Sequence, residues 1–155
     1  LVQGQVDSLL CWATDLPVAM EIQGVENVTM LLADHGYAVH SQTYIATEDS
    51  LANRRDQLVA LMKGEVMGWQ DYQADPAAAA ALTVEMFPDA GLDLATQELQ
   101  AERQVPLMFS DLTEAEGFGW FTDETVAANV EPLALLDKPV SADLWDRSIL
   151  EEVHG

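Results

Sequence analysis

The residues best suited to contact a ligand form an aromatic and polar set in the first forty residues. They are Trp12, Thr14, Asp15, Asp34 and Tyr37. An aromatic face can stack on a flat molecule, while carboxylates and hydroxyls accept its hydrogen-bond donors. Two other readings stay open: Trp12 could pack in a core, and Asp34 could bond the backbone of a turn that leads to Tyr37.

No catalytic or metal-binding pattern accompanies this set. His35 and His40 are five residues apart, which fits neither a helical metalloprotease motif nor a zinc finger, and His154 lies far along the chain. The single cysteine, Cys11, follows two leucines and is expected to pack as a small hydrophobe. Because the sequence also has no GxSxG motif and no glycine-rich phosphate loop, it predicts no catalytic residue, metal or cofactor.

A predicted β-α-β unit positions the candidate residues. Val6–Trp12 is an apolar run typical of a buried strand, and Val28–Leu32 is a second one. Between them Thr14 or Asp15 can cap a helix that ends at Gly24. Turns after parallel strands lie at the carboxyl edge of a sheet, where small ligands bind.

The rest of the chain is predicted to be mainly helical. Tyr37–Thr47 favours an extended crossing strand because it contains β-branched and aromatic residues. Capping residues, prolines and apolar spacing then predict helices over residues 53–74, 76–87, 93–104 and 122–136, with short helical turns over 141–153.

Two features of the helix over residues 53–74 bear on contacts. Gly64 and Gly68 are expected to mark a close approach of another helix. Arg54, Arg55 and Lys63 could bind phosphate, although solvation of the helix surface is the favoured interpretation.

Charge excludes some classes of partner. The 27 acidic and 6 basic residues among 155 give a net charge of −21, which repels nucleic acid and anionic lipid. The acids are spread along the chain, so a solvated surface suited to saline surroundings is favoured over an acidic patch that recruits a cationic partner. No segment approaches the roughly 20 apolar residues of a membrane span.

Several short motifs occur in order along the chain. The first are Gly4-Gln5-Val6-Asp7, the turn from Trp12 to Pro17, and Ala33-Asp34-His35-Gly36-Tyr37. The later ones are Gly68-Trp69-Gln70, Asp75-Pro76-Ala77-Ala78-Ala79 and Gly117-Phe118-Gly119-Trp120. Together these motifs resemble one family, the solute-binding proteins of ABC importers for nitrate, sulfonates, taurine and thiamin pyrimidine precursors, to which thiamin-pyrimidine synthases are related.

The resemblance implies an α/β fold, namely part of the two-lobed periplasmic binding protein type 2 architecture with a helix-rich C-terminal part. Residues 1–36 would be the end of the second lobe, residues 37–47 an interlobe crossing strand, and residues 48–155 the C-terminal helical part of the first lobe. The family's chains are longer, so the missing part would hold half of the ligand cleft.

The resemblance also implies a non-enzymatic, periplasmic or otherwise extracytoplasmic protein that hands a small-molecule ligand to an ABC transporter permease. Trp12 would stack on the ligand, Thr14 and Asp15 would hydrogen-bond it, and Asp34 and Tyr37 would lie at the hinge. The negative charge and the lack of an arginine near the turn favour a pyrimidine-like or cationic ligand over a sulfonate or nitrate.

Alternatives remain at this stage. One is a thiamin-pyrimidine synthase-like enzyme, although those relatives carry a cysteine-rich motif and this chain has one cysteine. Another is a truncated interaction or regulatory domain of the same fold. Unpaired strand edges would further leave the isolated chain dependent on self-association or on the missing half, with weak ligand binding otherwise.

Overall fold

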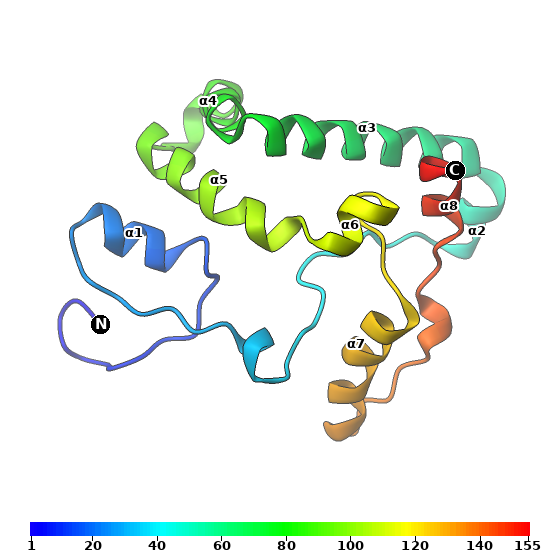
Figure 1. Cartoon of the computed structure of the whole chain (residues 1–155), viewed down its shortest axis with the longest axis horizontal. Helices are drawn as coiled ribbons and strands as arrows, with labels where there is room; N and C mark the ends of the chain where they lie inside the picture. Colours follow the sequence, from blue (N-terminus) through cyan, green and yellow to red (C-terminus); the bar gives the residue numbers. More distant parts are fainter. The chain divides into compact units, whose positions relative to one another are not determined.

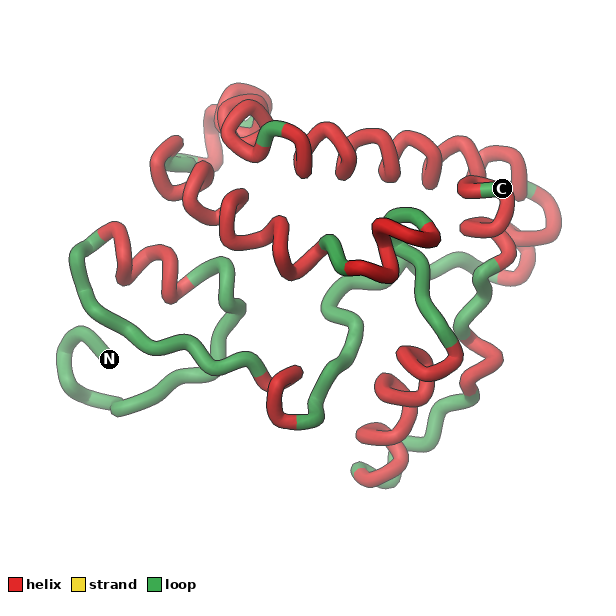
Figure 2. The backbone as a smooth tube through the Cα atoms, viewed as in Figure 1, coloured by secondary structure: helices red, strands yellow, loops and turns green.

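The computed structural model describes all residues from Leu1 to Gly155, and its regular elements are all helical (Figure 2). Their bounds are α1 (Leu16–Ile22), η1 (Leu32–His35), α2 (Glu48–Asn53), α3 (Arg55–Ala74), α4 (Pro76–Met86), η2 (Pro88–Ala90), α5 (Leu94–Met108), α6 (Asp111–Glu116), α7 (Asp123–Leu135), η3 (Ala142–Leu144) and α8 (Ser148–His154). None of the helices combines the length and the apolar character that crossing a membrane requires.

Backbone contacts divide the chain into two compact units (Figure 1). The first unit comprises residues 1–30 and 70–108, and the second comprises residues 31–69 and 109–155. Helix α3 contributes its first fifteen residues to the second unit and its last five to the first. The candidate residues of the turn before α1 therefore belong to a different unit from those near Gly36.

The first unit is built on α5, which contacts both α4 and α1. The buried side chains are Val18 and Met20 on α1, Ala80 on α4 and Ala101 on α5. Because alanine adds little bulk, Ala80 and Ala101 suit closely packed helices, although each buries little apolar area. The hydroxyl of Tyr72, at the end of α3, donates to Oε1 of Gln104 at 2.9 Å.

The second unit has a small core of aliphatic residues beside an aromatic cluster. Its buried aliphatic side chains are Val66, Val126, Ile149 and Leu150. The ring of Phe118 stacks on Trp69 with centroids 5.4 Å apart and lies 5.3 Å from the ring of Phe109. Such pairs contribute about 0.5–1.5 kcal/mol beyond the area that they bury.

Capping side chains account for where the helices start. The Thr47 hydroxyl accepts from the Ser50 amide at 3.1 Å before α2, and the Asp75 carboxylate accepts from the Ala78 amide at 2.9 Å before α4. Thr122 forms a reciprocal capping box with Thr125 at the start of α7. Each cap satisfies an amide that has no partner within its helix. The predictions of long helices after residue 53, and of helices that start at Pro76 and after Thr122, are confirmed.

The three predicted strands are absent. Val6–Trp12 and Tyr37–Thr47 are irregular, and so is Val28–Leu32 up to the start of η1. A strand requires a neighbouring strand to bond its amides and carbonyls, and these segments have none in this chain. Their apolar side chains lie in solvent instead, with Val28 97% and Ile45 94% exposed. The helix-rich part of the predicted fold is present, whereas its sheet is not.

Two interpretations of α3 also change. A Cβ atom added at Gly64 or Gly68 would meet nothing within 4 Å, so these glycines mark no close helix contact. Arg55 is not simply solvated, because its guanidinium pairs with Glu152 and donates to the Ser148 carbonyl at 2.9 Å. This arginine therefore fastens the start of α3 to α8.

The loop before α7 contains a position that only glycine fits. Gly117 has φ 107° and ψ 154°, which side-chain-bearing residues essentially never adopt. A Cβ atom at this position would also overlap the imidazole ring of His154, whose Nε2 lies 3.0 Å from the Phe118 carbonyl oxygen. The contact between this loop and α8 thus requires a residue without a Cβ atom at position 117.

Replacing Gly117 with alanine is expected to lower the free energy of unfolding by at least about 1–3 kcal/mol, because it adds backbone strain and displaces His154. Gly64→Ala is the matched control. It lies in open space on a helix and should raise the free energy of unfolding by about 0.4–1 kcal/mol. Urea unfolding followed by circular dichroism measures both, and equal effects of the two substitutions would contradict the packing described.

Salt is expected to stabilise the fold. With a net charge of −21, the acidic side chains repel one another and destabilise the folded state. Raising NaCl from about 0.01 M to about 1 M shortens the screening length from about 30 Å to about 3 Å and so weakens this repulsion. The same salt weakens three partly exposed ion pairs, but each contributes at most about 1 kcal/mol. The thermal unfolding midpoint should therefore rise with NaCl. A midpoint that falls would mean that the ion pairs outweigh the repulsion.

Candidate functional site

The turn before α1 presents Trp12 and Asp15 to solvent. The Asp15 amide donates to the Trp12 carbonyl at 3.1 Å, and the Ala19 amide donates to the Asp15 carbonyl at 3.0 Å. Asp15 stands at the N-cap position, but its carboxylate makes no capping hydrogen bond. Trp12 is 61% exposed, so the core-packing reading of this residue is wrong in this structure. The indole face and the carboxylate are both free to meet a ligand.

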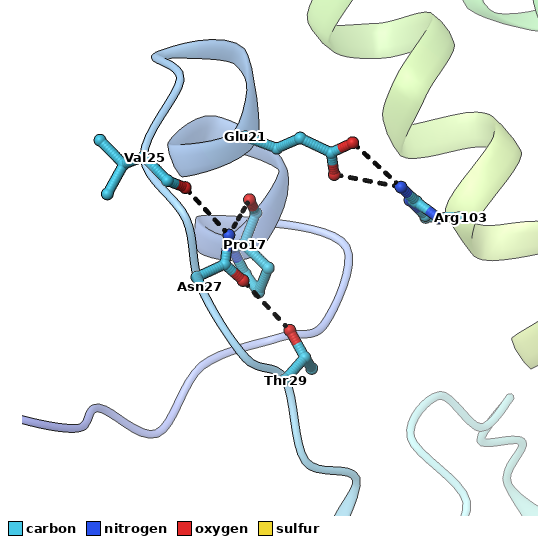
Figure 3. A network of polar contacts seen from close by, with 6 residues as sticks. All are labelled: Pro17, Glu21, Val25, Asn27, Thr29 and Arg103. Atoms are coloured by element: carbon cyan, nitrogen blue, oxygen red, sulfur yellow. Dashed lines mark hydrogen bonds and ion pairs between the residues drawn. The ribbon is translucent and has the colours of Figure 1, made fainter.

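Helix α1 is the platform on which this turn rests. Val18 is only 1% exposed and lies in the helix that contacts α5. On the same helix both carboxylate oxygens of Glu21 lie 3.1 Å from Nη2 of Arg103 on α5 (Figure 3). The buried valine near the start of α1 and the ion pair near its end both hold this helix to the first unit.

Asn27 holds the segment that follows α1, and sequence reasoning missed it. Its Nδ2 donates to the Pro17 carbonyl at 3.2 Å and to the Val25 carbonyl at 3.5 Å, and its Oδ1 accepts from the Thr29 hydroxyl at 3.5 Å (Figure 3). Pro17 is the last residue of the candidate turn, so the hydrogen bond from Asn27 connects this turn to the segment after α1. The amide type was visible in the sequence, but its partner ten residues away was not.

Asp34 and Tyr37 are brought together by one short helical turn. Asp34 lies within η1, Gly36 follows with φ 90°, and the Tyr37 amide donates to the Leu32 carbonyl at 3.0 Å. The turn is closed by backbone groups, so the proposed bond from the Asp34 side chain to this backbone does not form. Tyr37 is 47% exposed and Asp34 is exposed, which leaves both side chains open to solvent.

The five candidate residues thus form two local groups. Trp12, Thr14 and Asp15 share the turn before α1 in the first unit, and Asp34 and Tyr37 share η1 and its exit in the second. Thr14 is partly buried, while the other members are exposed. Each group combines one aromatic ring with at least one carboxylate.

The electrostatics of the first group favour hydrogen-bond donors as ligands. Residues 1–53 contain no lysine or arginine, so neither group carries a cation in its own segment. Arg103 does reach α1, but its Nη2 is held by Glu21. The turn therefore offers acceptors and an aromatic face without a positive charge to bind an anion.

A hollow of about 480 Å³ lies elsewhere in the first unit. Its walls come from α4 and α5, and it is lined by Pro76, Ala77, Ala95, Glu98, Leu99 and Glu102. No candidate residue lines this hollow. It consists of small apolar side chains beside two exposed glutamates, and it does not enlarge the set of ligand contacts at the turn.

The remaining reactive side chains form no further site. No three His, Cys, Asp or Glu side chains gather where they could hold a metal ion. Cys11 is exposed, so the expectation that it packs as a small hydrophobe is wrong in this structure. The reason is the missing strand, because without a sheet Leu9 and Leu10 beside it remain exposed as well.

Comparison with known proteins places this chain among its relatives. The chain is 26% identical over 145 residues to the riboflavin-binding protein RibY of Chloroflexus aurantiacus, a match that covers 90% of this chain. The same match covers 41% of that relative, so the chain spans less than half of its length. No solved structure matches the chain.

The family comparison covers the part of the chain that holds both candidate groups. The sequence model of the family described as NMT1/THI5 like matches residues 1–79, which are about half of the chain. The family predicted from the motifs is thereby confirmed: the chain belongs to the NMT1/THI5-like family.

Proposed function

We propose that this chain is part of a solute-binding protein of an ABC importer that captures a flat heteroaromatic compound outside the cytoplasm. The observation that carries the proposal is the exposed indole of Trp12, 61% accessible, at a turn that also presents Thr14 and Asp15. An exposed indole can stack on a flat ring, and the neighbouring oxygens can accept ring N–H donors. Trp12 is the stacking residue, and Thr14 and Asp15 select the orientation of the ligand.

The relatives support a ring compound as ligand. The protein from Chloroflexus aurantiacus is named for binding riboflavin, whose flat ring system carries polar edges. Thiamin pyrimidine precursors, implied by the family resemblance, are smaller rings with amino donors. Both present a face for Trp12 and donors for Asp15, so the same contacts serve either compound.

Anionic ligands fit the two groups less well. A sulfonate or nitrate needs fixed cationic or N–H donors around it, and residues 1–53 provide no lysine or arginine. The net charge of −21 would also disfavour the approach of an anion. We therefore place the ligand among neutral or cationic ring compounds.

The proposed fold explains the exposed apolar segments. In the two-lobed α/β architecture, residues 1–36 belong to the second lobe, residues 37–47 cross between lobes, and residues 48–155 complete the first lobe. Val28 and Ile45, which are 97% and 94% exposed, would then lie in strands with paired neighbours. An ABC permease is the proposed partner and the periplasm or cell exterior the proposed location. The comparisons lend no support to self-association.

Replacing Trp12 with alanine in the protein made from its full coding sequence should weaken riboflavin binding about 5- to 150-fold, because stacking a ring on an aromatic side chain contributes about 1–3 kcal/mol. The matched control is Leu82→Ala, which removes a 55% exposed apolar side chain from α4, outside the predicted strands. It should leave the dissociation constant within about twofold. Calorimetric titration measures both, and equal losses would contradict a stacking role.

The ligand class is tested by a panel on the same protein. Riboflavin and an aminopyrimidine are expected to bind at least about tenfold more tightly than taurine or nitrate, since only the rings can use the indole face. Competition titrations with each compound measure the order. If taurine or nitrate binds most tightly, the proposal of a ring ligand is wrong, even though a solute-binding role would stand.

A further inference from the structure

Asn129 on α7 is the one buried polar residue of the chain, with 9% of its surface exposed. Its Nδ2 donates to the Thr125 carbonyl at 2.7 Å, and its Oδ1 accepts from the His40 amide at 2.7 Å. These two bonds determine the orientation of the carboxamide. Turned over, its Nδ2 donor would face the His40 N–H donor and its Oδ1 acceptor would face the Thr125 carbonyl. Asn129 therefore ties α7 to a residue 89 positions earlier in the chain.

The side chain of His40 is held as well as its backbone. Its ring meets the ring of Phe121 edge-on, with centroids 6.1 Å apart. The guanidinium of Arg147 lies over the Phe121 ring, 5.7 Å from its centroid, and also donates to the Phe121 carbonyl at 3.3 Å. Partial burial lowers the pKa of His40, which favours the neutral form of the ring. The residue is thus anchored from two directions.

A second anchor lies four residues further on. Desolvation and the neighbouring Glu65 on α3 raise the pKa of Tyr44 to about 12, and Trp69 on the same helix opposes the shift. The hydroxyl therefore stays protonated at physiological pH, although the side chain as a whole is 62% exposed. Between these two anchors the chain forms no regular structure.

The anchor at His40 limits where Tyr37 can go. The two are three positions apart, and an extended chain of that length spans at most about 10 Å. On the other side, the Tyr37 amide is bonded to the Leu32 carbonyl at 3.0 Å. The short segment between Gly36 and His40 is therefore held at both ends within the second unit.

We propose that Asn129 is a positioning residue for the ligand contacts at Asp34 and Tyr37, although it touches neither. By fixing the backbone at His40, it confines the exit of η1 and holds the Tyr37 ring in the orientation in which it meets the ligand. The inference rests on the proposed function, since it assigns Asn129 a role only if Tyr37 contacts the ligand. A merely structural role would affect stability and leave the segment from Tyr37 to His40 unchanged.

The test compares Asn129→Ala with Val126→Ala, which also removes a buried side chain of α7 but one that makes no hydrogen bond to His40. Both variants of the protein made from its full coding sequence are examined by amide hydrogen exchange and by titration with riboflavin and an aminopyrimidine. Asn129→Ala should speed exchange of the His40 amide at least about tenfold and weaken binding about three- to tenfold, the effect of one lost hydrogen bond. Val126→Ala should change neither, even where it lowers the unfolding midpoint as much.

Each outcome decides between the roles. Equal loss of binding in the two variants, or binding that Asn129→Ala leaves intact, overturns the positioning role while the proposed function stands. Failure of the unsubstituted protein to bind any of the tested ring compounds overturns both. A His40 amide that exchanges at the rate of a free peptide in the unsubstituted protein overturns the tether itself.

Discussion

Shortage of positive charge is the constraint on which the tertiary structure depends. Six basic residues face 27 acids, and the three that form ion pairs, all arginines, each join segments that are distant in sequence. Arg55 joins α3 to α8, Arg103 joins α5 to α1, and Arg147 joins α8's N-cap to the start of α7. An exposed pair contributes only about 0–1 kcal/mol, so these arginines act mainly by selecting which helices meet.

The helices were predictable because their signals are local. Thr47, Asp75 and Thr122 each accept a hydrogen bond from an amide three residues ahead, and that geometry needs nothing from the rest of the chain. The strands were not predictable in this way, because an apolar run such as Val6–Trp12 identifies one strand but says nothing of the neighbouring strand that it must pair with. Without the other, the same residues remain coil, as Leu10 shows with 81% of its surface exposed. The pattern identified what the segment could pair with, not whether the partner is present.

The candidate site shows the same contrast between local signals and tertiary contacts. Turn chemistry identified the exposed residues near Asp15 and Gly36, and the structure places both sets in solvent-facing turns. The residues that hold those turns went unrecognised. Asn27 bonds Pro17 across ten positions, and Asn129 bonds His40 across 89. An asparagine looks the same in a sequence whether it caps a turn locally or bonds a remote backbone, so only tertiary contacts separate the two.

Under the proposed function, these supports also affect how a ligand binds. Trp12 and Tyr37 lie in segments without regular structure, each secured by a few hydrogen bonds. Ordering one residue costs about 1–2 kcal/mol of backbone entropy, a cost that a rigid scaffold pays on folding and a loose one pays on binding. A hydrogen bond such as that from the His40 amide to Oδ1 of Asn129 moves part of this cost from binding to folding. Affinity in such a site depends on remote polar contacts as much as on the aromatic rings, because the rings can contribute their stacking energy only when the backbone beneath them is already in place.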